Sequence, residues 1–209
     1  MKLSQKLNPN SILELIITSR VRRKILYLFF SEPNTYRHMR QVGREIDEQI
    51  NAVRRELMSL VKIDLLIIKK DGIKRQFILN PSFIFYNELR SLVMKTSPLA
   101  IELWNTYQNK ELGQIKYIFL THTFINRETS YPDNPDVVII GDGVNVIKLK
   151  EIQALIRTRE GRDIYVKIWS KPEFELEKGN NHPILYSLLV LPKCTLVGTD
   201  EEFAIEMGS

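Results

Sequence analysis

Apolar positions in the first 80 residues recur at helical spacings and then change to two short aliphatic runs. Spacings of three and four predict helices over residues 12–17, from Ser19 to about Phe30, across Met39 to Ile46, and from Ile50 through Leu60. The two runs that follow are predicted strands, Leu65 to Lys70 and Ile73 to Leu79. Asp71-Gly72 between them suits a two-residue hairpin turn, which requires positive φ angles. The last three of these helices therefore lead into a β-hairpin.

After Asn80-Pro81 the pattern changes twice. Apolar residues from Phe83 to Val93 predict a helix too apolar to stand alone in water, and a second helix is predicted from Leu99 to Gln108. Beyond Gly113, strands and helices alternate, which is typical of a small α/β domain. Its predicted strands are 115–124, 137–140, 164–169 and 195–197, and its predicted helices lie near 149–158, 172–178 and 183–191. We expect an α+β chain with domains at 1–80 and 113–209, joined by a helical connector or dimerisation segment at 81–112.

Charge is distributed unevenly along the chain. The 209 residues carry a net charge of +5, but residues 1–80 hold 16 Lys and Arg against 8 Asp and Glu, whereas residues 81–209 hold 14 against 17. A basic module joined to a slightly acidic one is typical of a protein that binds a polyanion. The alternative is that solvated helix faces simply happen to be basic. With 44% hydrophobic and 26% charged residues, the whole chain is expected to fold.

Metal and membrane chemistry find little support in the sequence. Cys194 is the only cysteine, so neither an intramolecular disulfide nor a cysteine-zinc cluster can form, and a reducing cytoplasm fits best. The three histidines are scattered without metal-ligand spacing, so we expect no metal and no cofactor. No apolar run reaches 18 residues and the N-terminus does not follow a signal-peptide pattern, so no membrane association is expected.

The order of three helices and a hairpin is that of a winged helix-turn-helix domain, whose third helix enters the major groove of DNA. Arg can bond guanine through two atoms, and Asn or Gln can do the same to adenine. The third predicted helix offers these side chains opposite its apolar face. The candidate base-contacting residues are Gln49, Asn51, Arg54 and Arg55.

Phosphate contacts are expected from two further groups of cations. Arg37, Arg40 and Arg44 follow helical spacing on the second predicted helix, with a solvated helix face as the alternative. Cations at a hairpin tip repel one another and gain little for folding unless an anion binds. The predicted tip carries Lys69, Lys70, Lys74 and Arg75. The first helix is a weaker case, because its long cations can simply flank a core; they are Arg20, Arg22, Arg23 and Lys24.

From Ser11 to Asn80 the chain resembles the ArsR-like winged-helix regulators of bacteria and archaea. The resemblance rests on SRVRRKILYLF, YRHMRQVGREI, NAVRREL and LLIIKKDGIKRQFILN, and GREIDEQINAVRREL is close to that family's recognition-helix pattern. It implies a transcriptional regulator, usually dimeric, that binds a two-fold-related site on double-stranded DNA. The resemblance covers about a third of the chain. The metal-binding cysteines of the metal-sensing members are missing.

From about Gly113 to Phe203 the chain looks like a minimal nucleotidyltransferase domain. The strings are YIFLTHTF, NPDVVIIGD, GRDIYVKIWSKPEF and LPKCTLVGTDEEF. Active members carry Gly-Ser after the first strand, Asp-x-Asp at the second and a third carboxylate on the next, which together hold two divalent cations and a triphosphate. Here Thr121-His122, Asn134 with Asp136, and Tyr165 stand at those positions. One carboxylate cannot organise two magnesium ions, so we expect no enzyme and a structural role for Asp136.

The second domain is therefore expected to serve dimerisation or effector sensing. Its former substrate cleft holds His122, Arg127, Asn134, Asp136 and Tyr165, which could retain a nucleotide-like effector or simply face solvent. Asp133, Asp142 and Asp163 lie near enough in sequence to replace a missing carboxylate. Two other classes stay open: an active nucleotidyltransferase guided by its winged helix, and a DNA-binding adaptor of a replication or mobile-element complex.

Overall fold

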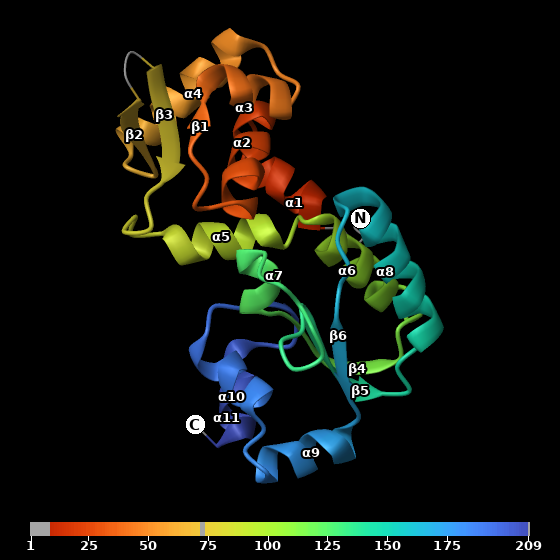
Figure 1. Cartoon of the computed structure of the whole chain (residues 1–209). Helices are drawn as coiled ribbons and strands as arrows, with labels where there is room; N and C mark the ends of the chain where they lie inside the picture. The colour runs from red at the N-terminus through yellow and green to blue at the C-terminus, as the bar shows by residue number, and fades with distance from the viewer. Residues whose placement is uncertain (1–8, 72–73, 209) are drawn as a thin grey trace, which may run out of the picture. The chain divides into compact units, whose positions relative to one another are not determined.

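The computed structural model describes residues 9–71 and 74–208, with side chains described outside 9–12, 71 and 74. The chain divides between Thr96 and Ser97 into two compact units (Figure 1). The predicted connector divides with it, because its first helix lies in unit 1 and its second in unit 2. Each unit has its own sheet.

Unit 1 contains five helices and a small sheet among the residues described. The helices are α1 Pro9–Ile16, α2 Arg20–Ser31, α3 Met39–Glu45, α4 Ile50–Lys62 and α5 Tyr86–Met94. The strands are β1 Arg37–His38, β2 Leu66–Asp71 and β3 Lys74–Leu79, antiparallel in the order β1-β3-β2. This order and pairing form a winged helix-turn-helix, so the three predicted helices and the hairpin are confirmed. The predicted Asp71-Gly72 turn falls partly outside the described residues.

Local chemistry explains the helix boundaries in unit 1. The Ser19 hydroxyl accepts a hydrogen bond from the Arg22 backbone N–H at 3.2 Å, which caps α2 as the sequence predicts. Asp47 adopts a φ of 51° in the turn between α3 and α4, a conformation that Asp tolerates better than most residues. The buried faces of α2, α3, α4 and β3 supply the core, which includes Ile25, Phe29, Phe30, Val42, Val53, Leu57, Leu60 and Phe77.

The apolar helix α5 finds its partner surface on α2. Phe30 and Tyr86 meet edge to face, with ring centroids 5.4 Å apart. Val93 and Met94 are buried on the same helix. The sequence indicates that this helix needs a partner, and the structure identifies the partner as α2.

Unit 2 is a mixed four-stranded sheet with helices. The strands are β4 Gln114–Leu120, β5 Val137–Asp142, β6 Val166–Trp169 and β7 Cys194–Val197, in the order β6-β5-β4-β7. β4 is antiparallel to both neighbours, whereas β5 and β6 are parallel. The helices are α6 Pro98–Gln108, α7 His122–Asn126, α8 Val146–Glu160, α9 Lys171–Gly179, α10 Pro183–Val190 and α11 Asp200–Met207.

Two details of unit 2 correct the sequence interpretation. The predicted strand 115–124 ends at Leu120, and the next residues form the short helix α7, because Thr121 leaves the sheet at the end of its pairing with β5. Helix α11 was not predicted, although Thr199 and Glu202 form a capping box at its start, a pattern visible in the sequence.

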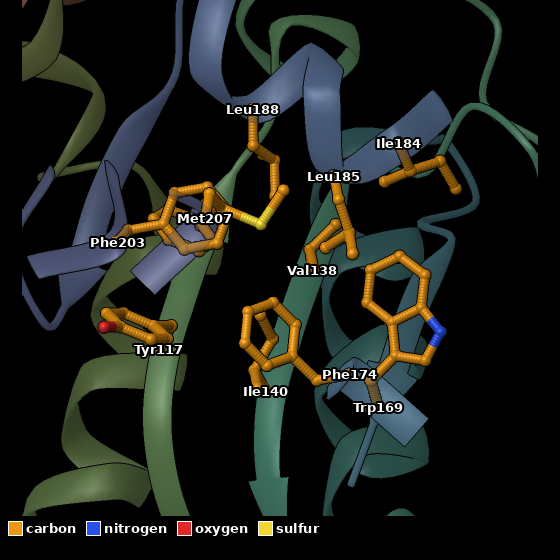
Figure 2. Close-up of a cluster of buried hydrophobic side chains, with 11 residues drawn as sticks. Tyr117, Val138, Ile140, Trp169, Phe174, Ile184, Leu185, Leu188, Phe203 and Met207 are labelled. Carbon is orange, nitrogen blue, oxygen red and sulfur yellow. The ribbon is translucent and has the colours of Figure 1, made fainter. Parts of the chain in front are cut away.

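The main core of unit 2 lies between the sheet and its C-terminal helices. Alternate positions of β4 and β5 point to one face, where they meet side chains from α9, α10 and α11 (Figure 2). Phe203 of α11 packs edge to face on Phe119, with centroids 4.8 Å apart. The cluster comprises Tyr117, Phe119, Val138, Ile140, Trp169, Phe174, Ile184, Leu185, Leu188, Phe203 and Met207. α11 therefore completes the core.

Gly141 tests the close approach of β4 and β5. An added Cβ would lie 2.5 Å from the Gln114 carbonyl oxygen, so Gly141→Ala should destabilise unit 2 by about 2 kcal/mol. Both tryptophans, Trp104 and Trp169, lie in unit 2, so urea unfolding followed by tryptophan fluorescence measures this unit.

Gly179→Ala is the matched control. A Cβ there meets nothing within 4 Å at the end of α9, and the expected change is below about 0.5 kcal/mol. Equal effects of the two substitutions would contradict the steric explanation.

Candidate nucleic-acid interface

Helix α4 presents its polar face to solvent. Val53, Leu57 and Leu60 are buried on one side, whereas the side chains predicted to contact bases are exposed on the other: Gln49, Asn51, Arg54 and Arg55. Gln49 is the N-cap residue and forms no side-chain capping bond, and the first turn holds no acidic residue. The start of α4 therefore keeps unsatisfied N–H groups and a positive end of the helix dipole, which favour an anion.

The preceding helix α3 adds two exposed arginines beside that start. Arg40 and Arg44 line an open hollow of about 950 Å³, together with Arg20, Gly43, Asp47, Glu48, Gln49 and Ile50. Arg40, Arg44, Arg54 and Arg55 make no side-chain ion pair or hydrogen bond within the part of the chain that the structure describes. These four guanidinium groups are consequently available to a ligand.

The hairpin carries a second set of exposed cations. Lys70 lies directly opposite Arg75 in the strand register, so like charges are neighbours across the hairpin. Lys69 places its ammonium 4.9 Å from the centre of the Tyr36 ring. Lys74 pairs with Asp71 through its backbone, and its side chain lies outside the described set. Lys69, Lys70 and Arg75 are thus all exposed, and the register makes Lys70 and Arg75 neighbours across the hairpin.

Arg37 is a correction to the sequence interpretation. It lies in β1 rather than on α3 with Arg40 and Arg44, and it is only 2% exposed. Its guanidinium pairs with Glu32 and, at 3.0 Å, with Glu45. The guanidinium is held by carboxylates inside the fold, which does not favour the predicted phosphate contact. Burial of the chain around β1, invisible to residue spacing, explains the difference.

The cations of the first helix are also engaged internally. Arg20 and Lys24 both pair with Glu48, at 3.0 and 2.8 Å, and the hydrogen bond from Lys24 helps to hold the pKa of that carboxyl below its ordinary value. Arg22 pairs with the buried Glu56 at 2.8 Å, and Arg23 with Glu14 at 3.2 Å. These ion pairs connect neighbouring segments of unit 1. This agrees with the prediction that the long cations of this helix can simply flank the core.

In unit 2 the structure brings together the strand ends that carry the predicted cleft. The Thr121 N–H donates to the Asp136 carbonyl and the Asp136 N–H donates to the Tyr165 carbonyl, both at 2.9 Å. The other predicted cleft residues are occupied by neighbours. Asn134 accepts from Thr123 at 2.6 Å, His122 lies 3.6 Å from Glu128, and Arg127 lies 4.0 Å from Glu160.

Asp136 is fully buried and its carboxylate is already occupied. One oxygen pairs with the Arg162 guanidinium and the other accepts from the Tyr165 N–H at 3.0 Å. Burial raises the pKa of the Asp136 carboxyl, against the opposing effects of Ser130, Arg162 and the Tyr165 backbone. This arrangement supports a structural role. The sequence analysis missed Arg162, because its position two residues after the end of α8 gives no sign of which strand it faces.

Two of the other carboxylates considered in unit 2, Asp142 and Asp163, have partners of their own. Asp142 pairs with Lys171 at 3.7 Å and Asp163 with Arg157 at 3.4 Å. Among the described residues, no group of three or more His, Cys, Asp or Glu is arranged to hold a metal ion. The same residues include no helix long and apolar enough to cross a membrane.

No protein-family model matches the chain, and no curated protein matches it. Among solved structures, reduced HlyU from Vibrio cholerae is 13% identical with a TM-score of 0.31, covering 41% of this chain and 82% of that protein. A homodimeric winged helix-turn-helix DNA-binding domain from Mycobacterium bovis, titled a possible ArsR-family transcriptional regulator, is 12% identical with a TM-score of 0.29, covering 53% and 94%. Human N-acetylserotonin methyltransferase with SAM is 13% identical with a TM-score of 0.30, covering 53% and 36%. Likeness this low carries no argument about function.

Asp136→Asn should destabilise unit 2 by about 2 kcal/mol, because Arg162 loses its charged acceptor in a buried setting. Urea unfolding followed by tryptophan fluorescence gives the value. Asp163→Asn is the control, since the exposed Asp163–Arg157 pair should contribute less than about 0.5 kcal/mol. If Asp136→Asn were as harmless as the control, the structural role of Asp136 would be refuted.

Proposed function

We propose that this protein is a sequence-specific DNA-binding transcriptional regulator that acts as a homodimer. One observation carries the proposal: on the exposed faces of α3 and α4, Arg40, Arg44, Arg54 and Arg55 form no ion pair within the described residues, whereas carboxylates of unit 1 hold Arg20, Arg22, Arg23 and Arg37. Cations without protein partners cost stability through mutual repulsion, and a polyanion removes that cost. The helix-turn-helix geometry suits the major groove of duplex DNA.

The proposed division of contacts follows the elements. Arg54, Arg55 and Asn51 on the exposed face of α4 would contact base edges, with Gln49 at its start. Arg40 and Arg44 on α3 would contact phosphates beside the start of α4, and Lys69, Lys70, Lys74 and Arg75 would contact the backbone or minor groove from the wing. Two copies related by a two-fold axis would then bind an inverted repeat.

Selection of duplexes from a random DNA library by the purified protein tests this proposal. We expect an inverted repeat, because a two-fold dimer presents two identical α4 helices. Arg54→Ala should weaken binding to the selected site by about 1–3 kcal/mol and relax the preference at one base position of each half-site. Titrations of the winning duplex at two salt concentrations provide the measurement.

Arg157→Ala, an exposed arginine on α8 of unit 2, is the control and should leave the affinity unchanged. Weak binding to every sequence, steeply dependent on salt and indifferent to Arg54, would reject a sequence-specific regulator. That result would favour a DNA-binding adaptor instead.

We further propose that unit 2 is a catalytically inactive nucleotidyltransferase-like domain that serves dimerisation or effector sensing. The order α6-β4-α7-β5-α8-β6 supports the likeness, and the occupied state of Asp136 supports the loss of catalysis. A carboxylate held by Arg162 and a backbone N–H has little capacity left for magnesium. A nucleotide-like effector would bind at this edge without reacting.

Incubation with magnesium and labelled nucleoside triphosphates should give no transfer to protein or RNA. The reason is that one buried carboxylate cannot replace the set that two-metal chemistry requires. Magnesium-dependent incorporation that Asp136→Asn abolishes, and that Asp163→Asn does not, would identify an active transferase and overturn this part of the proposal.

A further inference from the structure

The Arg37 side chain contacts several separate elements of unit 1. Its Nε atom donates to Glu45, the last residue of α3, at 3.0 Å. A terminal nitrogen pairs with Glu32, which follows α2, and another approaches the Glu32 carbonyl at 3.4 Å. The guanidinium also lies 5.5 Å from the centre of the Phe29 ring. One side chain thus contacts the C-terminal ends of both α2 and α3.

The backbone of Arg37 lies in β1, which pairs with strand β3 of the wing. Arg37 pairs with Phe77 in β3, which in turn pairs with β2, the strand carrying Lys69 and Lys70. On the other side, Glu45 lies four residues before Gln49, where α4 starts. The buried guanidinium is therefore a short mechanical link between the wing and the base-contacting helix.

Arg37 is buried and needs its carboxylate partners, whereas those carboxylates can also be solvated by water. It is 2% exposed, whereas the side chains of Glu32 and Glu45 are 47% and 34% exposed and keep contact with water. Replacing Arg37 by methionine leaves no deeply buried carboxylate without a partner and keeps a long apolar stem beside Phe29. The substitution removes the ion pairs, while the methionine side chain fills most of the space that the arginine occupied.

We propose that Arg37 is a positioning residue that couples the wing to helix α4, so that wing and helix contact one DNA duplex at the same time. This inference rests on the DNA-binding function proposed above. Arg37 touches no DNA in this scheme. Its effect is transmitted through Glu45 to the start of α4 and through β3 to the cations of β2.

A double-substitution cycle on a short mixed-sequence DNA duplex tests the coupling. Log affinity falls linearly with log salt. In the wild-type background, Lys69→Ala with Lys70→Ala should make this slope less steep by about 1.8, because two phosphate contacts are lost. In the Arg37→Met background the same pair should lower the slope by less than half as much, because the wing is no longer held against the duplex. Arg54→Ala should have the same effect in both backgrounds.

Arg23→Met is the matched control. Arg23 is also largely buried, with 16% of its side chain exposed, but it contacts Glu14 and the carbonyls of Ile17 and Thr18, far in sequence from the wing. In this background the lysine pair should lose the full slope. If Arg37→Met does not fold, Glu45→Ala cuts the link to α3 alone and should reduce the slope loss in the same way.

The outcomes separate the two proposals. An undiminished slope loss in the Arg37→Met or Glu45→Ala background would overturn the coupling, although DNA binding by the wild type would stand. Failure of the wild-type protein to bind any duplex would reject the proposed function, and the coupling with it.

Discussion

A charge that leaves water must find a partner, and this constraint organises both units of the chain. In unit 1 it holds Arg37 between Glu32 and Glu45, and it places the buried Glu56 against Arg22. In unit 2 it closes Arg162 onto Asp136.

In unit 1 the constraint separates cations that build the fold from cations that face outward. The carboxylates of Glu14, Glu48 and Glu56 engage the arginines and the lysine at the start of α2, and so tie that helix to α1, α4 and the turn before α4. The acidic residues of α3 and α4 have other partners, because Glu45 pairs with Arg37 and Glu56 with Arg22, and Arg40 and Arg54 form no ion pair within the described residues. A basic surface results because these carboxylates already form ion pairs within the fold. Such a surface supports a polyanionic partner.

In unit 2 a buried ion pair lies at the edge where β4, β5 and β6 meet. Backbone hydrogen bonds among Thr121, Asp136 and Tyr165 join the C-terminal end of β4 to the N-terminal ends of β5 and β6. Arg162 supplies a permanent cation there, and the Tyr165 N–H takes the second carboxylate oxygen. The edge is therefore stabilised as part of the fold.

Periodicity and capping patterns determined much of the fold: the helices of unit 1, the hairpin and most strands of unit 2 follow from local spacing, because a helix or strand must bury its apolar positions on one face. The sequence also placed Arg54, Arg55, Lys69 and Lys70 where the structure exposes them. It could not distinguish Arg37 from Arg40, nor pair Arg162 with Asp136. Those outcomes depend on which distant segments meet, and only the tertiary structure decides which charges are removed from water and therefore paired.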